Sequence, residues 1–440
     1  MHLAAHFPGV SNTTVWTDPR SRSQIEFSSF EHLARTAERG LFDFFFLAEG
    51  LRLREHKGRI HDLDVVGGPE SLTVLNALAA VTDRLGLAAT VNATFNEPYE
   101  LARRLATLDH LSAGRAAWNV VTCSDALTGE NFRRGGFLDR GERHLRAAEF
   151  IATARELWDS WTPEGVSRPF AHRGRHFDIA GEFTVPRSPQ GYPVVIQARD
   201  SDEGRECAAS TADVLISGWG CGGCPPGRHS TRHGTLEAGR AFYADVKRRL
   251  ATYGRSPGDL KIMPGVTVVL GDTAAEAQER ATEIKRQQVS PQNAILALEQ
   301  VWGVDLSSYD PDGPLPEIDP VADSSITQGR TRRRDTVAIA EKWRALSKEK
   351  GLSIRQTVIE VSDRQSFIGT PEAVAAELDT FVQRDAADGF ILVPHLTPGG
   401  LDEFVDRVVP LLQERGAFRT EYKGRTLRSH LGLPDPVWKG

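Results

Sequence analysis

The chain has 440 residues, of which 40% are apolar and 25% are charged, and its formal net charge is −6. This length is enough to bury a large core, as one large α/β domain or as two smaller ones. The slight negative charge gives no electrostatic reason to bind nucleic acid or an anionic membrane, so we expect neither partner.

Targeting signals and a disulfide framework are absent from the sequence pattern. No stretch reaches the roughly 18 apolar residues that a membrane-spanning helix needs. The first residues, MHLAAHFPGV, have neither a basic region nor a long apolar segment, so we expect no secretory signal. Four cysteines are too few for a disulfide scaffold in a chain of this length: Cys123, Cys207, Cys221 and Cys224. We therefore expect a cytoplasmic protein.

Short apolar runs alternate with stretches of helical periodicity along the chain. We predict eight strands, over residues 2–7, 42–48, 85–91, 116–121, 194–197, 214–217, 262–270 and 390–393. We predict helices over residues 30–39, 71–82, 98–111, 145–161, 236–253, 274–288 and 371–385. Eight strands that alternate with helices are typical of an α/β fold of the (β/α)8 TIM barrel type, and a doubly wound open sheet is the alternative.

The spacing between the predicted strands is uneven, because long segments follow some of them. We expect one domain over residues 1–440, with insertions in the loops at the C-terminal face, over about 123–190, 218–232 and 290–365. Residues 303–335 are rich in Pro, Gly and Asp and then basic, which is typical of a loop. Such a loop is either a lid over the site or a solvated surface insertion.

Residues 85–122 form the most informative segment, a predicted strand, helix and strand. The first strand ends in Asn92 and Thr94, and the second runs into Asn119 and Thr122. In parallel α/β folds, ligands bind at the carboxyl ends of the strands. Asn92, Thr94 and Thr122 are therefore predicted to form the edge of a binding site.

An unusual segment, SGWGCGGCPPGRHSTRHGTLEAG, covers residues 217–239. Its glycines fit G-x-G-x-x-G, but Pro225 and Pro226 stand where a dinucleotide-binding helix would begin. Cys221, Cys224, His229 and His233 have the spacing of a zinc knuckle, and Cys221 with Cys224 could form a redox pair. We favour an insertion over the barrel mouth and predict no metal site.

The chain resembles the flavin-dependent monooxygenases of the bacterial luciferase-like superfamily. Within it, the chain resembles the branch of nitrilotriacetate monooxygenase component A and dibenzothiophene-sulfone monooxygenase. The resemblance covers nearly the whole chain and rests on long motifs in the same order, namely FDFFFLAEGL (42–51), ATVNATFNEPYELARRLATLDHLSAGRAAWNVVT (89–122), ERHLRAAEFIATARELWDSW (142–161), VPRSPQGYPVVIQARDSDEGRECAASTADV (185–214), IGTPEAVAAEL (368–378) and ADGFILVPHLTPGGLDEFVDRVVPLLQERGAFRTEYKGRTLRSHLGL (387–433).

The resemblance implies reduced FMN (FMNH2) bound at the carboxyl ends of the barrel strands. An acidic residue that follows the family's second strand corresponds to Glu49, where Asp is commoner. Polar residues that close the third strand correspond to Asn92 and Thr94, and Thr122 closes the fourth. These side chains would bind the polar edge of the flavin ring. The alternative is that Asn92 and Thr94 only satisfy nearby backbone groups.

The family also has a His and a Tyr four residues apart at the start of the fourth helix, on one helical face. Here these positions are Arg140 and His144. Arg140 could bind the FMN phosphate through two hydrogen bonds. His144 is the predicted catalytic residue, because imidazole carries protons near neutral pH. The alternative is a surface arginine and an ordinary helix histidine.

The family's phosphate-binding segment after the fifth strand corresponds to residues 197–201, QARDS. Ser201 is retained and also suits the first turn of a helix as its N-cap. Arg199 replaces a glycine, so it either crowds the phosphate or adds a positive charge to it. We expect both residues to contact FMN.

The resemblance implies the oxygenase component of a two-component system. A separate NAD(P)H:flavin reductase would supply FMNH2, and a C4a-hydroperoxyflavin would oxygenate a small organic substrate with O2, often cleaving a C–N or C–S bond. The protein would orient the cofactor and exclude water. Homodimers or homotetramers are usual in the family. The alternatives are an F420-dependent oxidoreductase of the same superfamily and a non-catalytic flavin-binding protein. Aromatic candidates for the apolar wall of the site, each with plain core packing as the alternative, are Phe7, Trp16, Phe46, Phe95 and Trp118.

Overall fold

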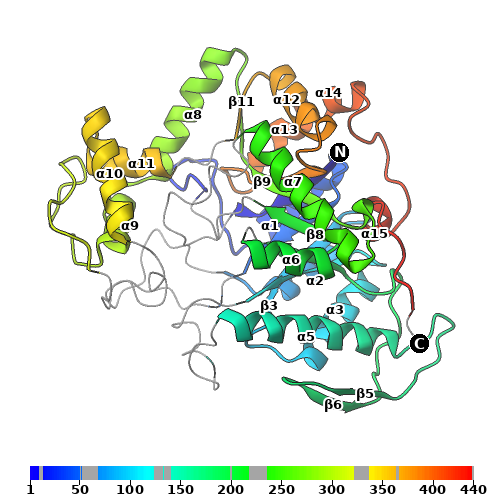
Figure 1. Cartoon of the computed structure of the whole chain (residues 1–440). Coiled ribbons are helices and arrows are strands. Elements are labelled where there is room, and N and C mark those ends of the chain that lie inside the picture. The colour runs from blue at the N-terminus through cyan, green and yellow to red at the C-terminus, as the bar shows by residue number, and fades with distance from the viewer. Residues whose placement is uncertain are drawn as a thin grey trace.

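Eight parallel strands close into a barrel in the computed structural model, which confirms the predicted TIM barrel and makes the open-sheet alternative wrong (Figure 1). The order around the barrel is β1-β12-β9-β8-β7-β4-β3-β2. Its strands are β1 (His2–His6), β2 (Phe44–Leu47), β3 (Gly86–Asn92), β4 (Ala116–Val121), β7 (Val194–Ala198), β8 (Val214–Ser217), β9 (Lys261–Val266) and β12 (Gly389–Leu392). The structure describes residues 1–8, 13–49, 51, 68–122, 132, 140–198, 201–217, 235–321, 336–362 and 366–438, with the backbone alone for 140 and 141.

Alternate residues of each strand face the barrel interior and the surrounding helices, as the period of two in a strand requires. In β2, Phe44 and Phe46 pack inside the barrel, whereas Phe45 and Leu47 pack against the helices. Because both faces of these strands are buried, they are continuous apolar runs without a polar face. This pattern is why the barrel strands could be found from the sequence.

Helices surround the barrel, and several begin with a side chain that caps the helix. Thr235, Thr273 and Thr370 each accept a hydrogen bond from the amide three residues further on. The surrounding helices are α1 (Phe27–Arg39), α2 (Ser71–Ala79), α3 (Pro98–Leu111), α5 (Arg140–Asp159), α6 (Asp202–Thr211), α7 (Leu236–Leu250), α8 (Ala274–Gln288), α12 (Pro371–Gln383), α13 (Asp402–Arg407) and α14 (Val409–Glu414).

The strand predicted over residues 262–270 is wrong as a single element. β9 ends at Val266 in the barrel, and β10 (Val268–Leu270) pairs instead with β11 (Phe367–Gly369) in a separate two-stranded sheet. The two parts pair with different partners, β9 with β8 and β12, and β10 with β11 alone. A continuous apolar run therefore serves two sheets.

A hairpin lies outside the barrel, in the connection from α5 to β7. Its strands, β5 (Phe170–Arg173) and β6 (Asp178–Gly181), are antiparallel. The insertion predicted over residues 123–190 contains this hairpin, which lies in a helix-to-strand connection at the amino end of the barrel and not in a loop at the carboxyl end of a strand. The tip of the hairpin nevertheless reaches the start of α5, where Arg175 pairs with Glu142 at 2.7 Å.

Three helices between α8 and β11 form a unit with its own apolar core. They are α9 (Pro291–Trp302), α10 (Thr336–Lys350) and α11 (Ile354–Val361). Trp302 and Trp343 lie in this core, and their ring centroids are 6.1 Å apart. The described part of the Pro-rich segment, up to residue 321, is bound to this unit, since Trp302 Nε1 donates to Ile318 O. Its role as a lid stays a prediction.

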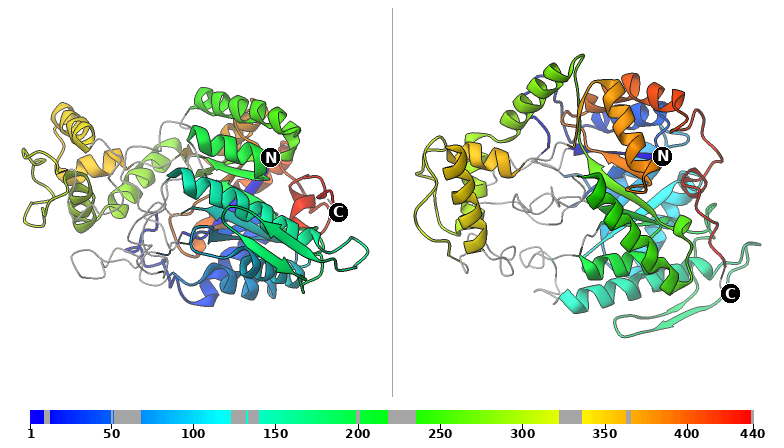
Figure 2. Two further views of the ribbon diagram at one scale, coloured as in Figure 1. Left: turned by 60° about the horizontal axis from the view of Figure 1, so that its bottom comes forward. Right: turned by 45° about the horizontal axis from the view of Figure 1, so that its top comes forward.

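The unit α9–α11 and the C-terminal segment lie at opposite ends of the barrel (Figures 1 and 2). At the amino end, α15 (Leu427–His430) directs Leu427, with Leu431 and Leu433 just beyond it, into the barrel interior. The barrel is therefore closed at this end by its own C-terminal segment. Within the described residues, none of the helices combines the length and the apolar character needed to cross a membrane.

Candidate functional site

Asn92 ends β3 and organises the turn that follows it. Its Oδ1 accepts hydrogen bonds from the amides of Thr94 at 2.6 Å and Phe95 at 3.3 Å. Asn96 Nδ2 donates to Asn92 O at 2.7 Å. The alternative role, satisfying backbone groups, is therefore what the oxygen of Asn92 performs. Its Nδ2 has no acceptor among the described residues, which leaves one donor at the carboxyl end of the strand.

A polar pair lies one step deeper, and our sequence analysis did not assign it to the site. Thr90 of β3 and Asn119 of β4 are in register, and Asn119 Nδ2 donates to Thr90 Oγ1 at 3.0 Å. Ala88 and Ala117, two residues earlier, face the barrel interior, so the pair faces it too. Asn119 Oδ1 is buried and has no hydrogen-bond partner in the described structure. A polar residue within an apolar strand was the signal that could have identified it.

Glu49, which follows β2, lies against the start of α2. Its Oε2 accepts a hydrogen bond from Ser71 N at 2.9 Å. Burial raises the pKa of the Glu49 carboxyl, and the Ser71 amide opposes this rise. Glu49 is therefore a half-buried acid at the carboxyl end of the barrel, as the family pattern predicted, and one of its oxygens is used to hold α2.

Helix α5 carries the predicted pair Arg140 and His144 on its first turns. The side chain of Arg140 lies outside the described residues, and His144 is half-buried. Arg199 also lies outside them. Their contacts with a cofactor, and the catalytic role of His144, stay predictions. Thr122 is half-buried directly after β4, in line with the predicted edge.

Two further histidines lie at this end of the barrel, and the sequence analysis missed both. His6 ends β1, is fully buried and lies 5.4 Å from the Phe46 ring, between centroids. Burial lowers its pKa to about 3. Burial, with the positive charge of Arg20, also lowers the pKa of His395 after β12 to about 4. Both imidazoles are neutral at pH 7, so they line the mouth without adding charge.

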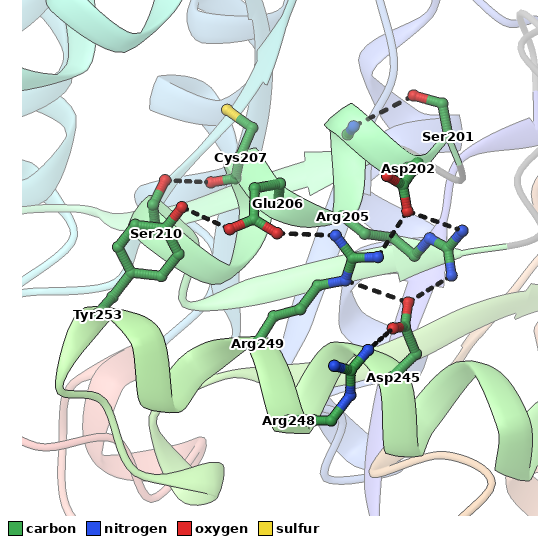
Figure 3. Close-up of polar contacts among 11 residues, drawn as sticks. Ser201, Asp202, Arg205, Glu206, Cys207, Ser210, Asp245, Arg248, Arg249 and Tyr253 are labelled. Carbon is green, nitrogen blue, oxygen red and sulfur yellow. Dashed lines mark hydrogen bonds and ion pairs between the residues drawn. The ribbon is translucent and has the colours of Figure 1, made fainter.

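Ser201 is the N-cap of α6, as predicted, because its Oγ accepts a hydrogen bond from Gly204 N at 3.1 Å (Figure 3). The first turn also carries the carboxylate of Asp202. Arg249 Nη2 donates to Asp202 at 2.5 Å, and Arg205 lies 3.6 Å from the same oxygen. These arginines offset the negative charge beside the helix start, which favours an anion there.

For two of the five aromatic candidates, the structure shows the alternative of core packing. Phe7 packs against α1, with its ring 4.1 Å from Phe30 between centroids. Trp118 also faces outward, since its Nε1 donates to Val91 O and its ring lies beside Phe150. Both alternate with interior-facing neighbours on their strands, which directs them to the helices. Phe46 does face the interior, Phe95 stacks on Phe132 at 4.5 Å, and Trp16 is exposed.

The residues at the carboxyl end fit a flavin ring in their hydrogen-bonding character. The polar edge of the ring offers both N–H groups and carbonyl oxygens. Within the described residues, Asn119 Oδ1 is a buried acceptor without a donor, and Asn92 Nδ2 is a donor without an acceptor. The amide groups and arginines at the start of α6 have the positive character that a phosphate would require. The segment with Cys221 and Cys224 lies outside the described residues, and those that are described contain no cluster of three metal-binding side chains.

Comparisons with known proteins show the family to which this fold and chain are similar. Residues 9–389 match the family model of luciferase-like monooxygenases. Nitrilotriacetate monooxygenase component A from Aminobacter aminovorans is 39% identical over 95% of this chain and 92% of its own length. Dibenzothiophene-sulfone monooxygenase from Rhodococcus erythropolis strain XP is 37% identical over 100% and 98%. The structure of EDTA monooxygenase from Chelativorans sp. BNC1 superposes with a TM-score of 0.73, at 28% identity, over 99% of both chains.

Proposed function

Because this chain belongs to the luciferase-like monooxygenase family, we propose that it is the FMN-dependent oxygenase component of a two-component monooxygenase. The observation that carries the proposal is a pair of polar atoms on adjacent barrel strands: Asn119 Oδ1 is buried, and neither it nor Asn92 Nδ2 has a hydrogen-bond partner among the described residues. Their donor and acceptor match the polar edge of a flavin ring. Reduced FMN would supply the electrons that activate O2 when it is bound.

Each part of the site has a separate task in this proposal. Asn92, Thr94, Asn119 and Thr122 bind the ring edge, and Glu49 supports the same edge from the start of α2. Ser201, Arg140 and Arg199 hold the phosphate. His144 holds or moves the proton that the reaction requires. The neutral His6 and the apolar Phe46 line the barrel below the site and exclude water.

The relatives indicate the substrate class and the partner. Nitrilotriacetate and EDTA contain C–N bonds, and dibenzothiophene sulfone contains C–S bonds. We propose that this chain oxygenates a small organic molecule next to such a bond and cleaves it. The designation of one relative as component A supports a second protein, which we propose is an NAD(P)H:flavin reductase. Assembly as a homodimer or homotetramer stays a prediction.

Anaerobic titration tests the proposal. We expect photoreduced FMN to bind stoichiometrically, with a change in flavin absorbance, and to react with O2 when the complex is mixed with oxygenated buffer. Product from a panel of amines and thioethers should contain one atom from ¹⁸O₂. Tight F420 binding without binding of reduced FMN would establish the hydride-transfer alternative instead. Tight FMN binding without any oxygen reaction would identify a binding protein.

A second experiment tests the phosphate end alone. Ser201→Asp places a carboxylate where the phosphate is expected, and we expect FMN affinity to fall by more than about tenfold. Riboflavin has no phosphate, so its affinity should change little. Asp keeps the N-cap of α6, so a loss cannot come from a frayed helix. Equal affinity of wild type and variant for FMN would refute this placement of the phosphate.

A further inference from the structure

Arg146 is a buried arginine on α5, next to the turn that follows β3. Its side chain is only 3% exposed. Nη2 donates to Asn96 O at 3.1 Å, and Nε donates to Thr94 O at 3.4 Å. Both carbonyls belong to the turn that Asn92 organises from within. The outer side of the ring-binding turn is therefore held by one guanidinium from a different element.

The guanidinium is itself fixed by an aromatic ring from the hairpin. Its carbon lies 4.3 Å from the centroid of Phe177, which follows the hairpin tip. Glu97 adds a longer ion pair at 3.8 Å. Arg suits this position because its planar group stacks on a ring and donates in fixed directions at the same time, which Lys cannot do. Phe177 also shields the guanidinium from water, which strengthens its hydrogen bonds.

Contacts with α5 hold the hairpin tip in place. Glu149 accepts hydrogen bonds from His176 N at 2.9 Å and from Phe177 N at 3.0 Å. His172 Nε2 lies 3.4 Å from the same carboxylate. The insertion is therefore bound along α5 by polar contacts that place Phe177 over Arg146. A hairpin without a role at the site would not require these contacts with α5.

We propose that Arg146 is a positioning residue for the flavin ring, and that the β5–β6 hairpin acts on the site through Phe177 and Arg146. The inference rests on the proposed function, since it assigns the 92–96 turn to the ring. Arg146 does not contact the cofactor in this account. It fixes the turn so that Asn92 Nδ2 points along one direction, and small displacements of such groups weaken binding strongly.

The test compares Arg146→Lys with a matched control, Arg155→Lys. Arg155 lies on the same helix, donates to Thr211 O at 2.7 Å and lies 5.5 Å from the ring of Tyr192, but it contacts no residue of the turn in the described structure. Dissociation constants of photoreduced FMN and photoreduced riboflavin are measured anaerobically, by the change in flavin absorbance. Thermal unfolding without flavin is measured for both variants.

We expect Arg146→Lys to raise the dissociation constants of FMN and riboflavin by the same factor of about ten. This factor corresponds to the loss of one charged hydrogen bond. Arg155→Lys should leave both dissociation constants unchanged. The two Lys variants should lower the unfolding temperature by similar amounts. Phe177→Leu, which keeps the arginine but removes its ring, should weaken both ligands about threefold. The Leu variant also serves as the test if Arg146→Lys does not fold.

Four results would overturn the inference and are distinguishable from failure of the proposed function. Arg146→Lys could bind both flavins as tightly as wild type. It could weaken FMN but not riboflavin, which would assign Arg146 to the phosphate. Both Lys variants could lose affinity equally, which would indicate a general effect on α5. Phe177→Leu could leave both constants unchanged, which would remove the hairpin from the account. In contrast, wild-type protein that binds neither flavin would refute the proposed function itself.

Discussion

The two ends of the barrel use polar side chains in opposite ways. At the amino end, Asp43 is fully buried and accepts hydrogen bonds from Leu3 N at 2.9 Å, from His2 and from Arg419 of the C-terminal segment. At the carboxyl end, Asn119 Oδ1 is also buried, but none of the described residues donates a hydrogen bond to it. One end uses its charges to bind the chain to itself, and the other leaves polar atoms available.

The amino end of the barrel therefore contributes to stability, and the carboxyl end is available for ligand binding. The apolar residues after α15 and the ion pair of Arg419 with Asp43 close the amino end of the barrel. The strands then present their carboxyl ends to ligands, as TIM barrels do in general. Variants at the amino end should therefore change unfolding without changing flavin affinity, and variants at the carboxyl end should do the reverse.

The largest effect is expected at Asp43. Asp43→Ala leaves Arg419 without its buried partner, and breaking such a pair costs about 3–5 kcal/mol. Urea denaturation should show this loss in the free energy of unfolding, while the remaining folded protein binds FMN with wild-type affinity. Asp406→Ala is the control, because Asp406 pairs with Arg39 at the exposed surface and should cost less than about 1 kcal/mol. A large change in FMN affinity for folded Asp43→Ala would break the separation of the two ends.

The next effect concerns acid sensitivity at both ends. Burial lowers the pKa of His6 to about 3 and that of His430 to about 4. The pKa of histidine in the unfolded chain is about 6.5. The stability that depends on these neutral imidazoles is therefore fully present above that pH and is lost as the pH falls toward 4. Each histidine should lower the free energy of unfolding by about 2 kcal/mol between pH 7 and pH 5.

His430→Leu tests this at the amino end alone. The variant should lose about 2 kcal/mol less than wild type between pH 7 and pH 5, measured by urea denaturation at both pH values. FMN affinity at pH 7 should stay unchanged. His32→Leu is the control, since its side chain is 46% exposed. The idea fails if wild type and His430→Leu have the same pH dependence.

The sequence predicted the barrel well because both faces of its strands are buried. β4 and β8 were predicted at their observed bounds, and α3 and α8 likewise. The hairpin was missed because β5 and β6 are mostly exposed and short, so they carry no apolar run. The division of 262–270 was missed because one apolar pattern served strands in two sheets. Pairing partners are set by tertiary contacts that periodicity does not encode.

The sequence indicated site positions where a polar residue ends a strand or caps the helix that follows. Asn92 and Ser201 carried such signals, and the structure gives both a defined local role. Arg146 carried none, because a lone arginine in a helix is usually solvated, and its burial depends on Phe177 from a distant segment. His6 was missed because the first strand was predicted to continue to residue 7, and its burial follows from the closure of the barrel.

A smaller effect, confined to binding, is expected for Asn92→Asp. An aspartate retains an oxygen that accepts from Thr94 N and Phe95 N, so the turn should persist and unfolding should change by less than about 1 kcal/mol. It loses the Nδ2 donor and adds a negative charge, so FMN should bind about tenfold more weakly. The anaerobic titration with photoreduced FMN measures this affinity. Asn76→Asp, which loses a bond to Leu72 O on α2, should leave FMN affinity unchanged. Identical affinities of Asn92→Asp and wild type would show that the donor is not used.

The smallest effect is expected on the flank of the barrel, between its two ends. Arg248 pairs with Asp245 at 2.7 Å, but its side chain is 75% exposed, so Arg248→Ala should change the free energy of unfolding by less than about 0.5 kcal/mol. Asp245 also accepts from Arg205 and Arg249, which hold Asp202 beside Ser201 (Figure 3). Asp245→Ala should therefore cost about 1 kcal/mol, and it should change FMN affinity by no more than about twofold, because both arginines keep their contact with Asp202. Urea denaturation and FMN titration of the two variants measure both quantities. A loss of FMN affinity in Arg248→Ala would show that this surface network, and not the strand ends alone, sets the phosphate site.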